Sequence, residues 1–156
     1  MILEDERWMK EALLEAKLAK EENEVPVGAI VVQAGKIIGR GHNRVETLKD
    51  PTAHAEIIAI TSACNTLGDW RLNDSTLYVT LEPCPMCAGA ILVSRIKRCV
   101  FGVKDTNLGS LGSVYSIKSS EMDITSGILE SECKALLRNF FKVVRHKNKM
   151  EGWPSG

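Results

Sequence analysis

The chain has 156 residues, and its 20 basic residues balance its 20 acidic ones, so the formal net charge at pH 7 is zero. This length suits one domain with one core, spanning residues 1–156. No apolar run approaches the roughly 18 residues of a membrane span, and the charged N-terminus does not resemble a signal peptide. We therefore expect a cytoplasmic protein without a membrane partner.

Charge is distributed unevenly along the chain. Residues 1–24 hold eight acids and four bases, whereas residues 134–150 hold six bases and no acid. Such asymmetry indicates either an RNA-facing surface or an ordinary solvated helix face, and the two interpretations start about even. Four of the bases recur at spacings of four, four and three, which places them on one helix face: Lys134, Arg138, Lys142 and Arg145.

The first half of the chain predicts a helix followed by a hairpin. Residues 4–20 are rich in Glu, Ala, Leu and Lys, which favour helices. Two β-branched, apolar runs follow at 27–33 and 36–41, and the Ala34-Gly35 pair between them predicts a turn. Residues 43–50 predict a polar loop.

The second half predicts alternating helices and strands. A helix is expected from Pro51-Thr52 to Leu67, with Thr52 as its cap and Gly68 as its stop. A strand over 76–81, a helix opened by Pro83 and Pro85 and ending near residue 94, and a strand over 98–103 follow. Residues 105–127 give no clear pattern beyond one doubtful strand. Residues 128–147 predict a long amphipathic helix, with 148–156 as a flexible tail.

The order of these elements is α-β-β-α-β-α-β, then the doubtful strand and the last helix. Strands that alternate with helices predict a three-layer α/β/α domain. Strands connected through helices run parallel, whereas the first two form an antiparallel hairpin, so the expected sheet is mixed.

Five cysteines are present, at positions 64, 84, 87, 99 and 133. Their odd number and spacing do not fit a disulfide scaffold, and in a reducing compartment thiols are metal ligands, catalytic groups or core residues. Cys64, Cys99 and Cys133 lie inside apolar patterns, so we expect them in the core.

Cys84 and Cys87 lie three residues apart in the first turn of an expected helix, so they share a face and form a natural metal clamp. The free N–H groups and the dipole of a helix N-terminus favour thiolates. His54 supplies a third ligand suited to zinc. Three protein ligands leave one tetrahedral position for water, which distinguishes a catalytic zinc site from a structural one.

His54 and Glu56 are two residues apart and do not share a helix face. Both reach one metal only if it lies beyond the end of the helix, so we expect two helix N-termini to converge on one Zn²⁺ per chain. Glu56 is then an acid/base and not a ligand. A lone Cys-x-x-Cys or His-x-Glu is a weak signal, but the two together, each opening an expected helix, are strong. His42 and His146 are expected to be ordinary surface or loop residues.

The combination of His-x-Glu with Pro-Cys-x-x-Cys is the pattern of zinc-dependent nucleobase deaminases. Over nearly its whole length the chain resembles the bacterial tRNA-specific adenosine deaminases of the cytidine/deoxycytidylate deaminase superfamily. The matching segments are Glu24–Ala29, Gly41–Arg44, Asp50–Ile57, Leu77–Ala90, Phe101–Asp105 and Phe140-Phe141.

The resemblance implies a cytidine-deaminase-like fold with a five-stranded sheet flanked by helices, and a homodimer. It implies conversion of the wobble adenosine of a tRNA anticodon, that of an arginine tRNA, to inosine. It assigns Asn43 and the backbone N–H of Ala55 to the target nucleotide. Asp105 and Phe141 match positions near the bound anticodon loop.

We expect residues 98–105 and the last helix to contact the RNA. Lys142 and Arg145 would bind phosphates without reading sequence, and Phe141 would stack on an unpaired base. Phe140 is expected in the core. The apolar helix over residues 88–93 is the expected dimer contact.

Two departures from the family fall on the RNA-binding side. The segment 116–124 is short and lacks an Asn-His pair, and Lys142-Val143-Val144-Arg145 stands where the family is arginine-rich. The alternatives are a small-molecule deaminase of the same fold, for guanine or for cytidine, and a non-catalytic zinc-binding partner subunit. Glu56 argues against the last, because a structural zinc module needs no acid/base beside its metal.

Overall fold

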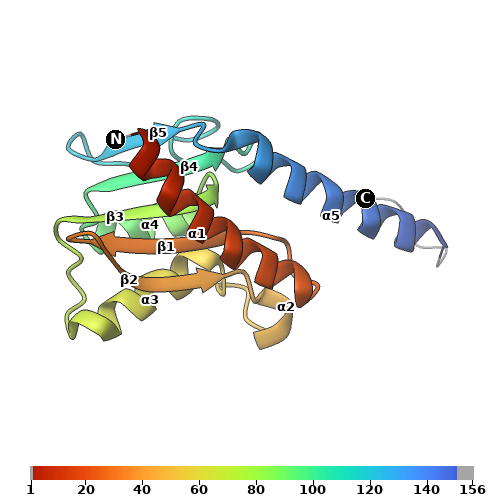
Figure 1. Ribbon diagram of the computed structural model, residues 1–156, viewed down its shortest axis with the longest axis horizontal. Helices are drawn as coiled ribbons and strands as arrows, with labels where there is room; N and C mark the ends of the chain where they lie inside the picture. Colours follow the sequence, from red (N-terminus) through yellow and green to blue (C-terminus); the bar gives the residue numbers. More distant parts are fainter. Residues whose placement is uncertain (1, 151–156) are drawn as a thin grey trace.

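The computed structural model describes the backbone of residues 2–150 and the side chains of residues 2–147. Helices and strands alternate along most of this length (Figure 1). The elements are α1 (Ile2–Glu21), β1 (Gly28–Gln33), β2 (Lys36–His42), α2 (Val45–Leu48), α3 (Ala55–Leu67), β3 (Ser75–Leu81), α4 (Pro85–Val93), β4 (Arg98–Val103), β5 (Asp123–Ser126) and α5 (Glu130–Met150).

The five strands form one mixed sheet in the order β2-β1-β3-β4-β5. β1 is antiparallel to both of its neighbours, so Ile30 lies opposite Arg40 on one side and Tyr78 on the other. β3 pairs with β4, and β4 with β5, in parallel. The carboxyl ends of β3 and β4 therefore meet at one edge of the sheet, which is where open α/β sheets bind their ligands. The predicted mixed five-stranded sheet is confirmed.

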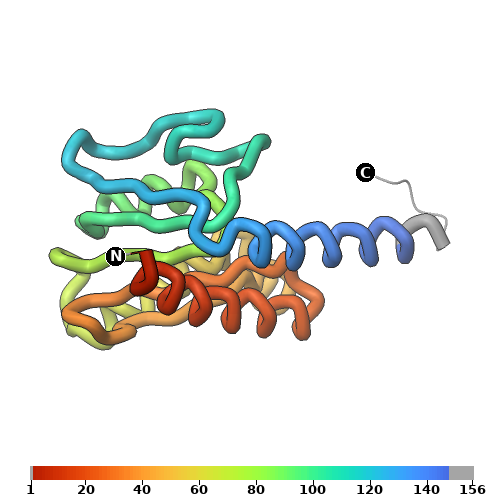
Figure 2. The backbone as a smooth tube through the Cα atoms, turned by 45° about the horizontal axis from the view of Figure 1, so that its top comes forward, coloured from red at the N-terminus to blue at the C-terminus, as the bar shows by residue number. Residues whose placement is uncertain are grey.

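Helices cover both faces of the sheet (Figures 1 and 2). α1 and α5 pack on the face that carries Ile30 and Val100. α3 and α4 pack on the opposite face, against Val31 and Val79. Adjacent residues of β1 serve different layers because successive side chains of a strand point to opposite faces. This arrangement confirms the three-layer α/β/α prediction.

The β1–β2 hairpin is held closely between α1 and α3. A Cβ atom on Gly28 would lie 2.0 Å from the carbonyl oxygen of Ala12 in α1, and one on Gly39 would lie 2.3 Å from that of Ala59 in α3. Only glycine allows such an approach, so helix backbones touch the hairpin from both sides. Asn43 follows directly after this fixed hairpin.

A buried ion pair fastens α1 to the far end of β4. Asp5 is 2% exposed and accepts two hydrogen bonds of 2.8 Å from Arg98 and one of 2.8 Å from the Tyr78 hydroxyl. Arg98 also donates to Thr125 Oγ1 at 2.9 Å. Burial opposes ionisation of Asp5, but the hydrogen bonds from Arg98 and Tyr78 outweigh it and hold the pKa of this carboxyl below its usual range. Arg98 thus belongs to the fold's interior contacts, at the opposite end of β4 from the pocket.

Two segments differ from the sequence-based expectations, and a third agrees with them. Residues 43–50, expected as a loop, contain the short helix α2. The doubtful strand expected within 105–127 is present as β5, the edge strand beside β4. The last helix begins at residue 130 instead of 128, because Gly127 and Leu129 adopt positive φ values of 84° and 52° that break a helix.

The C-terminal turns of α5 extend beyond the end of the sheet (Figure 2). Residues 148–150 are helical and not part of a tail, whereas residues 151–156 lie outside the described residues. Cys99 and Cys133 are buried as predicted, and Cys64 is half-buried against the core. Within residues 2–150, no helix combines the length and apolar character that a membrane crossing needs.

Candidate metal centre and substrate pocket

α3 and α4 begin side by side at the edge of the sheet, and each presents a metal-binding residue at its N-cap. His54 caps α3 and Cys84 caps α4, both with extended backbone. The predicted starts were too early: the Thr52 hydroxyl binds Asp50 at 2.7 Å instead of capping a helix, and α4 begins after Pro83. The later starts turn the two N-cap side chains toward each other, which confirms the expected convergence of two helix N-termini.

The spacing of three donor atoms fits a zinc ion. His54 Nδ1 lies 3.5 Å from the Sγ of Cys84 and 3.5 Å from the Sγ of Cys87, and all three atoms lie within 4.8 Å of one another. Bond lengths of about 2.1 Å to nitrogen and 2.3 Å to sulfur, at tetrahedral angles, place the two donors about 3.6 Å apart. The observed separations therefore match one Zn²⁺ per chain, with a fourth position left for a small ligand.

The two thiols of this group share a negative charge unequally. The hydrogen bond from Cys87 lowers the pKa of Cys84 to about 4, with help from His54 and against the effect of burial. The same thiol–thiol contact raises the pKa of Cys87. Only thiolates hold a metal, so metal binding must release the second proton as well.

Glu56 lies in the first turn of α3, two residues after His54, and is 4% exposed. Burial raises the pKa of its carboxyl to about 7, and the negative charge of Cys84 adds to the effect. A carboxyl that titrates near neutral pH both accepts and donates protons efficiently. Its position beside the donor group, buried and facing the cavity, is that of an acid/base group.

A cavity of about 220 Å³ opens in front of these residues. Asn43, at the end of the hairpin, and Asp105, after β4, lie on its walls together with His54 and Glu56. Ala55 also lines it, and the N–H group of this first residue of α3 has no acceptor inside the helix. The structure thus brings together at one cavity the metal, catalytic and nucleotide-contacting residues predicted from the sequence, except Cys87, which is buried behind it, and the residues of α5.

Glu82 holds the loop that forms one wall of the cavity, and sequence reasoning did not single it out, although it directly precedes Pro83. Its carboxylate is 2% exposed and accepts hydrogen bonds from the backbone N–H groups of Asp105, Leu111 and Ser113, and from the Ser113 hydroxyl. A Cβ on Gly109 would collide with this carboxylate. The position of Glu82 directly before the Pro-Cys-x-x-Cys motif is the sequence signal that could have identified it.

A groove of about 890 Å³ runs from the mouth of the cavity to α5. It shares Asn43 and His54 with the cavity, and Phe140, Phe141 and Lys147 line its other side. Phe141 is 42% exposed, whereas Phe140, expected in the core, is half-buried and packs edge-to-face on Phe141. Lys142 and Arg145 are exposed on α5 outside the groove lining.

Comparison with known proteins agrees with this site. Residues 3–103 match the family model described as the cytidine and deoxycytidylate deaminase zinc-binding region. The chain belongs to this family. It is accordingly a zinc-dependent deaminase, since the matched region contains His54, Glu56 and both thiols of the donor group.

Two relatives share most of the chain. A tRNA-specific adenosine deaminase from Bacillus subtilis is 48% identical over 151 residues, covering 94% of this chain and 94% of the relative. A solved structure from work on A-to-I editing by tRNA:A34 deaminases at the wobble position superposes with a TM-score of 0.81 at 44% identity, over 84% of this chain and 99% of that one.

A guanine deaminase from Bacillus subtilis is also similar. It superposes with a TM-score of 0.62 at 41% identity, over 69% of each chain. The shared fold and metal motif therefore leave the choice of nucleobase to the residues outside them.

Proposed function

We propose that this deaminase converts adenosine to inosine at the wobble position of a tRNA anticodon, and that arginine tRNA is its substrate. The observation that carries the proposal is that a small cavity opens into a larger groove. The cavity of about 220 Å³ suits a single base, and the groove of about 890 Å³ that continues from it suits the flanking nucleotides of a single strand. A base in a loop is already unpaired, so it enters such a cavity at low energetic cost.

In this proposal, His54, Cys84 and Cys87 hold the zinc ion. When bound, zinc lowers the pKa of a coordinated water to about 7. Glu56 moves the protons: its carboxylate accepts one from the attacking water and its carboxyl donates it to N1 of adenine. After the new C6–O bond has formed, Glu56 takes the remaining proton from that oxygen and gives it to the amino group; the C6–N bond breaks, ammonia leaves and the C6 carbonyl of inosine remains.

Three further groups would hold the nucleotide. The side-chain Oδ1 of Asn43 is buried and has no hydrogen-bond partner in the described part of the chain, so it is ready to accept a hydrogen bond from the substrate. The free N–H of Ala55 suits an acceptor on the base. Asp105 lines the same cavity and lies in the loop that Glu82 holds.

The RNA on either side of the target base would lie along α5. Phe141 lines the groove with an exposed ring, which suits stacking on an unpaired base. Lys142 and Arg145 are exposed on the same helix and suit phosphate oxygens. The Asn-His pair and the additional arginines of the family are missing, so phosphate binding would depend on Lys142 and Arg145 of α5 and on Lys20 and Lys147, which line the groove.

The homodimer belongs to the same proposal. α4 buries Ala88 and Ile91 against the sheet but leaves Leu92 and Val93 exposed by 38% and 69%. Exposed apolar residues beside a buried face suit a second copy of the helix, and the small, half-buried residues Gly89 and Ala90 permit a close approach.

The test measures deamination by the zinc-loaded protein of a tRNA anticodon stem-loop, of free guanine and of cytidine under the same conditions. Inosine from the stem-loop, with little turnover of the free nucleobases, supports the proposal. Turnover of guanine without inosine formation would assign the small-molecule activity instead. Absence of any turnover in a protein that binds one zinc per chain would favour the non-catalytic partner subunit.

A further inference from the structure

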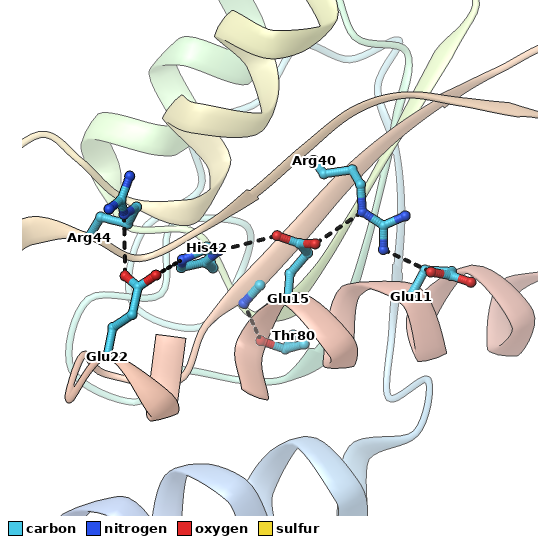
Figure 3. Close-up of polar contacts among 8 residues, drawn as sticks. Glu11, Glu15, Glu22, Arg40, His42, Arg44 and Thr80 are labelled. Atoms are coloured by element: carbon cyan, nitrogen blue, oxygen red, sulfur yellow. Dashed lines mark hydrogen bonds and ion pairs between the residues drawn. The ribbon is translucent and has the colours of Figure 1, made fainter. Parts of the chain in front are cut away.

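The acidic N-terminal segment is largely engaged by other parts of the fold. Glu11 and Glu15 both bind Arg40, at 2.8 and 3.0 Å. Glu15 and Glu22 bind the two ring nitrogens of His42, at 3.2 and 3.1 Å. In Figure 3 these side chains form a continuous row between α1 and β2. His42, expected to be an ordinary surface or loop residue, is therefore half-buried between two carboxylates, and that expectation is wrong.

The row of contacts continues past the end of α1 as a clasp between residues 22–27 and residues 42–47. Glu22 accepts a second hydrogen bond from Arg44 Nε at 3.2 Å (Figure 3). The carbonyl oxygen of Val25 accepts from Asn43 Nδ2 at 3.4 Å, and that of Val27 accepts from the Asn43 N–H at 3.1 Å. The clasp thus holds Asn43 by its backbone and by one end of its amide.

Glu24 makes the innermost contact of the clasp. It is 2% exposed, and its Oε2 accepts hydrogen bonds of 2.6 Å from both the N–H and the hydroxyl of Thr47. Its Oε1 accepts from the Glu46 N–H at 3.1 Å. These N–H groups belong to the first turn of α2 and have no acceptor inside that helix. Glu24 therefore fixes the first turn of α2, which begins at Val45, two residues after Asn43.

The electrostatics favour a charged Glu24. Burial alone would raise the pKa of its carboxyl, but the hydrogen bonds from Thr47 and Glu46 outweigh burial and hold the pKa below its usual range. An ionised carboxylate at a helix N-terminus also interacts favourably with the helix dipole. Glu24 is thus charged across the neutral pH range, so its hydrogen bonds to the first turn of α2 persist there.

Asn43 is the residue on which the clasp acts. Asn43 lines the cavity, its Nδ2 is bound, and its Oδ1 is buried without a hydrogen-bond partner among the described residues. A buried amide oxygen without a partner is stabilised when the side chain rotates toward a hydrogen-bond donor. Fixing the segment that carries the amide limits this rotation. We propose that Glu24 is a positioning residue for substrate recognition, which holds residues 46 and 47 so that Asn43 keeps its oxygen turned toward the substrate. The identity of that substrate rests on the proposed function, but the positioning role does not.

The first experiment needs no substrate. Backbone amide exchange of the zinc-loaded protein is followed by NMR in the parent and in two variants, Glu24→Gln and Thr47→Val. Thr47 is exposed, so Thr47→Val removes only the hydroxyl contact and leaves the core untouched. We expect exchange at Glu46 and Thr47 to become about tenfold faster in Glu24→Gln, with a smaller increase in Thr47→Val.

Two matched controls separate this effect from general changes in charge or stability. Thr47→Ser retains the hydroxyl and should exchange like the parent. Glu21→Gln removes the same charge from an exposed residue three positions away and should also exchange like the parent. Zinc content should equal one per chain in every variant.

The second experiment tests coupling to Asn43 in a double-mutant cycle on the stem-loop. Glu24→Gln should lower kcat roughly 10- to 100-fold, the size expected when a contacting group is misplaced by about 1 Å. In an Asn43→Ala background the same substitution should change kcat by less than about threefold, because the group that it misplaces is already gone.

Parent-like exchange at residues 46 and 47 in both Glu24→Gln and Thr47→Val would overturn the positioning role. So would effects on kcat that multiply fully with those of Asn43→Ala, because a purely structural contribution behaves in that way. If the parent deaminates guanine and not the stem-loop, the proposed function fails, and the same cycle run on guanine decides whether Glu24 positions Asn43.

Discussion

Replacing Asp5 by Asn tests whether the buried pair with Arg98 holds α1 on the sheet. Asparagine keeps one acceptor oxygen but places an NH₂ group against a guanidinium, so at least one of the two 2.8 Å contacts from Arg98 is lost. Breaking a buried pair in this way costs about 3–5 kcal/mol. Because Arg98 is 18% exposed and still reaches Thr125 at 2.9 Å, we expect the lower end of this range, about 3 kcal/mol at pH 7.

The contribution of Asp5 has a defined pH dependence. Burial opposes ionisation, but the hydrogen bonds from Arg98 and Tyr78 hold the pKa of this carboxyl below its usual value in the folded protein. A carboxyl with a lowered folded pKa stabilises the fold at pH values above the unfolded pKa, and this stabilisation disappears as pH falls through the folded pKa. The difference in unfolding free energy between the parent and Asp5→Asn should therefore be full at pH 7 and pH 5 and should shrink below about pH 4.

Urea denaturation at fixed protein and zinc concentration measures this difference. With a slope of about 2 kcal/mol per molar urea, the loss shifts the midpoint by about 1.5 M at pH 7 without changing the slope. Glu4→Gln is the matched control, because Glu4 lies in the same first turn but is exposed. A difference between parent and Asp5→Asn that is as large at pH 3 as at pH 7 would show that the carboxylate charge is not what stabilises the fold.

Three predictions follow from the proposed function. Glu56→Ala should retain one zinc per chain by elemental analysis and lose at least 10²-fold in turnover, of the order that general acid–base catalysis contributes; loss of the metal or retained turnover would contradict the role of Glu56. Combined neutralisation of Lys142, Arg145 and Lys147 should weaken tRNA binding and reduce its dependence on salt by about 0.7–0.9 log units for each lost phosphate contact; parent-like binding at every salt concentration would place the RNA elsewhere. Sedimentation at micromolar concentration should give twice the chain mass of 17.2 kDa, and a mass equal to one chain would exclude the dimer.

The sequence was sufficient for the features that depend on period and spacing. The hairpin around Ala34-Gly35 follows from two apolar runs and a turn, and the three-layer order follows from the alternation of strands and helices. The convergence of the two helix N-termini could be deduced because His54 and Glu56, two residues apart, cannot share a helix face. Both side chains can reach one metal only if it lies beyond the end of the helix. These arguments use only local backbone geometry, which is determined by residues close together in the sequence.

Features that depend on distant partners could not be predicted. The start of α3 at Ala55 and not at Thr52 is set by the bond between Thr52 and Asp50 and by the packing of His54, which no N-cap preference reveals. The sequence around His42 is that of a loop residue, and only the fold places Glu15 of α1 and Glu22, which directly follows α1, beside its ring. Glu82 directly precedes the Pro-Cys-x-x-Cys motif, but only the folded loop that includes Ser113 shows what its carboxylate binds.

The extension of α5 past the sheet separates residues that stabilise the fold from residues that are proposed to bind RNA. Substitutions of its exposed residues between 141 and 147 change the free energy of unfolding by no more than about 0.5 kcal/mol, because they touch little of the interior. If α5 binds RNA as proposed, the same substitutions change how strongly the RNA is held. Affinity for RNA could then be redesigned by exchanging this helical segment, while the part of the fold that carries His54, Glu56 and the two thiols stays unchanged.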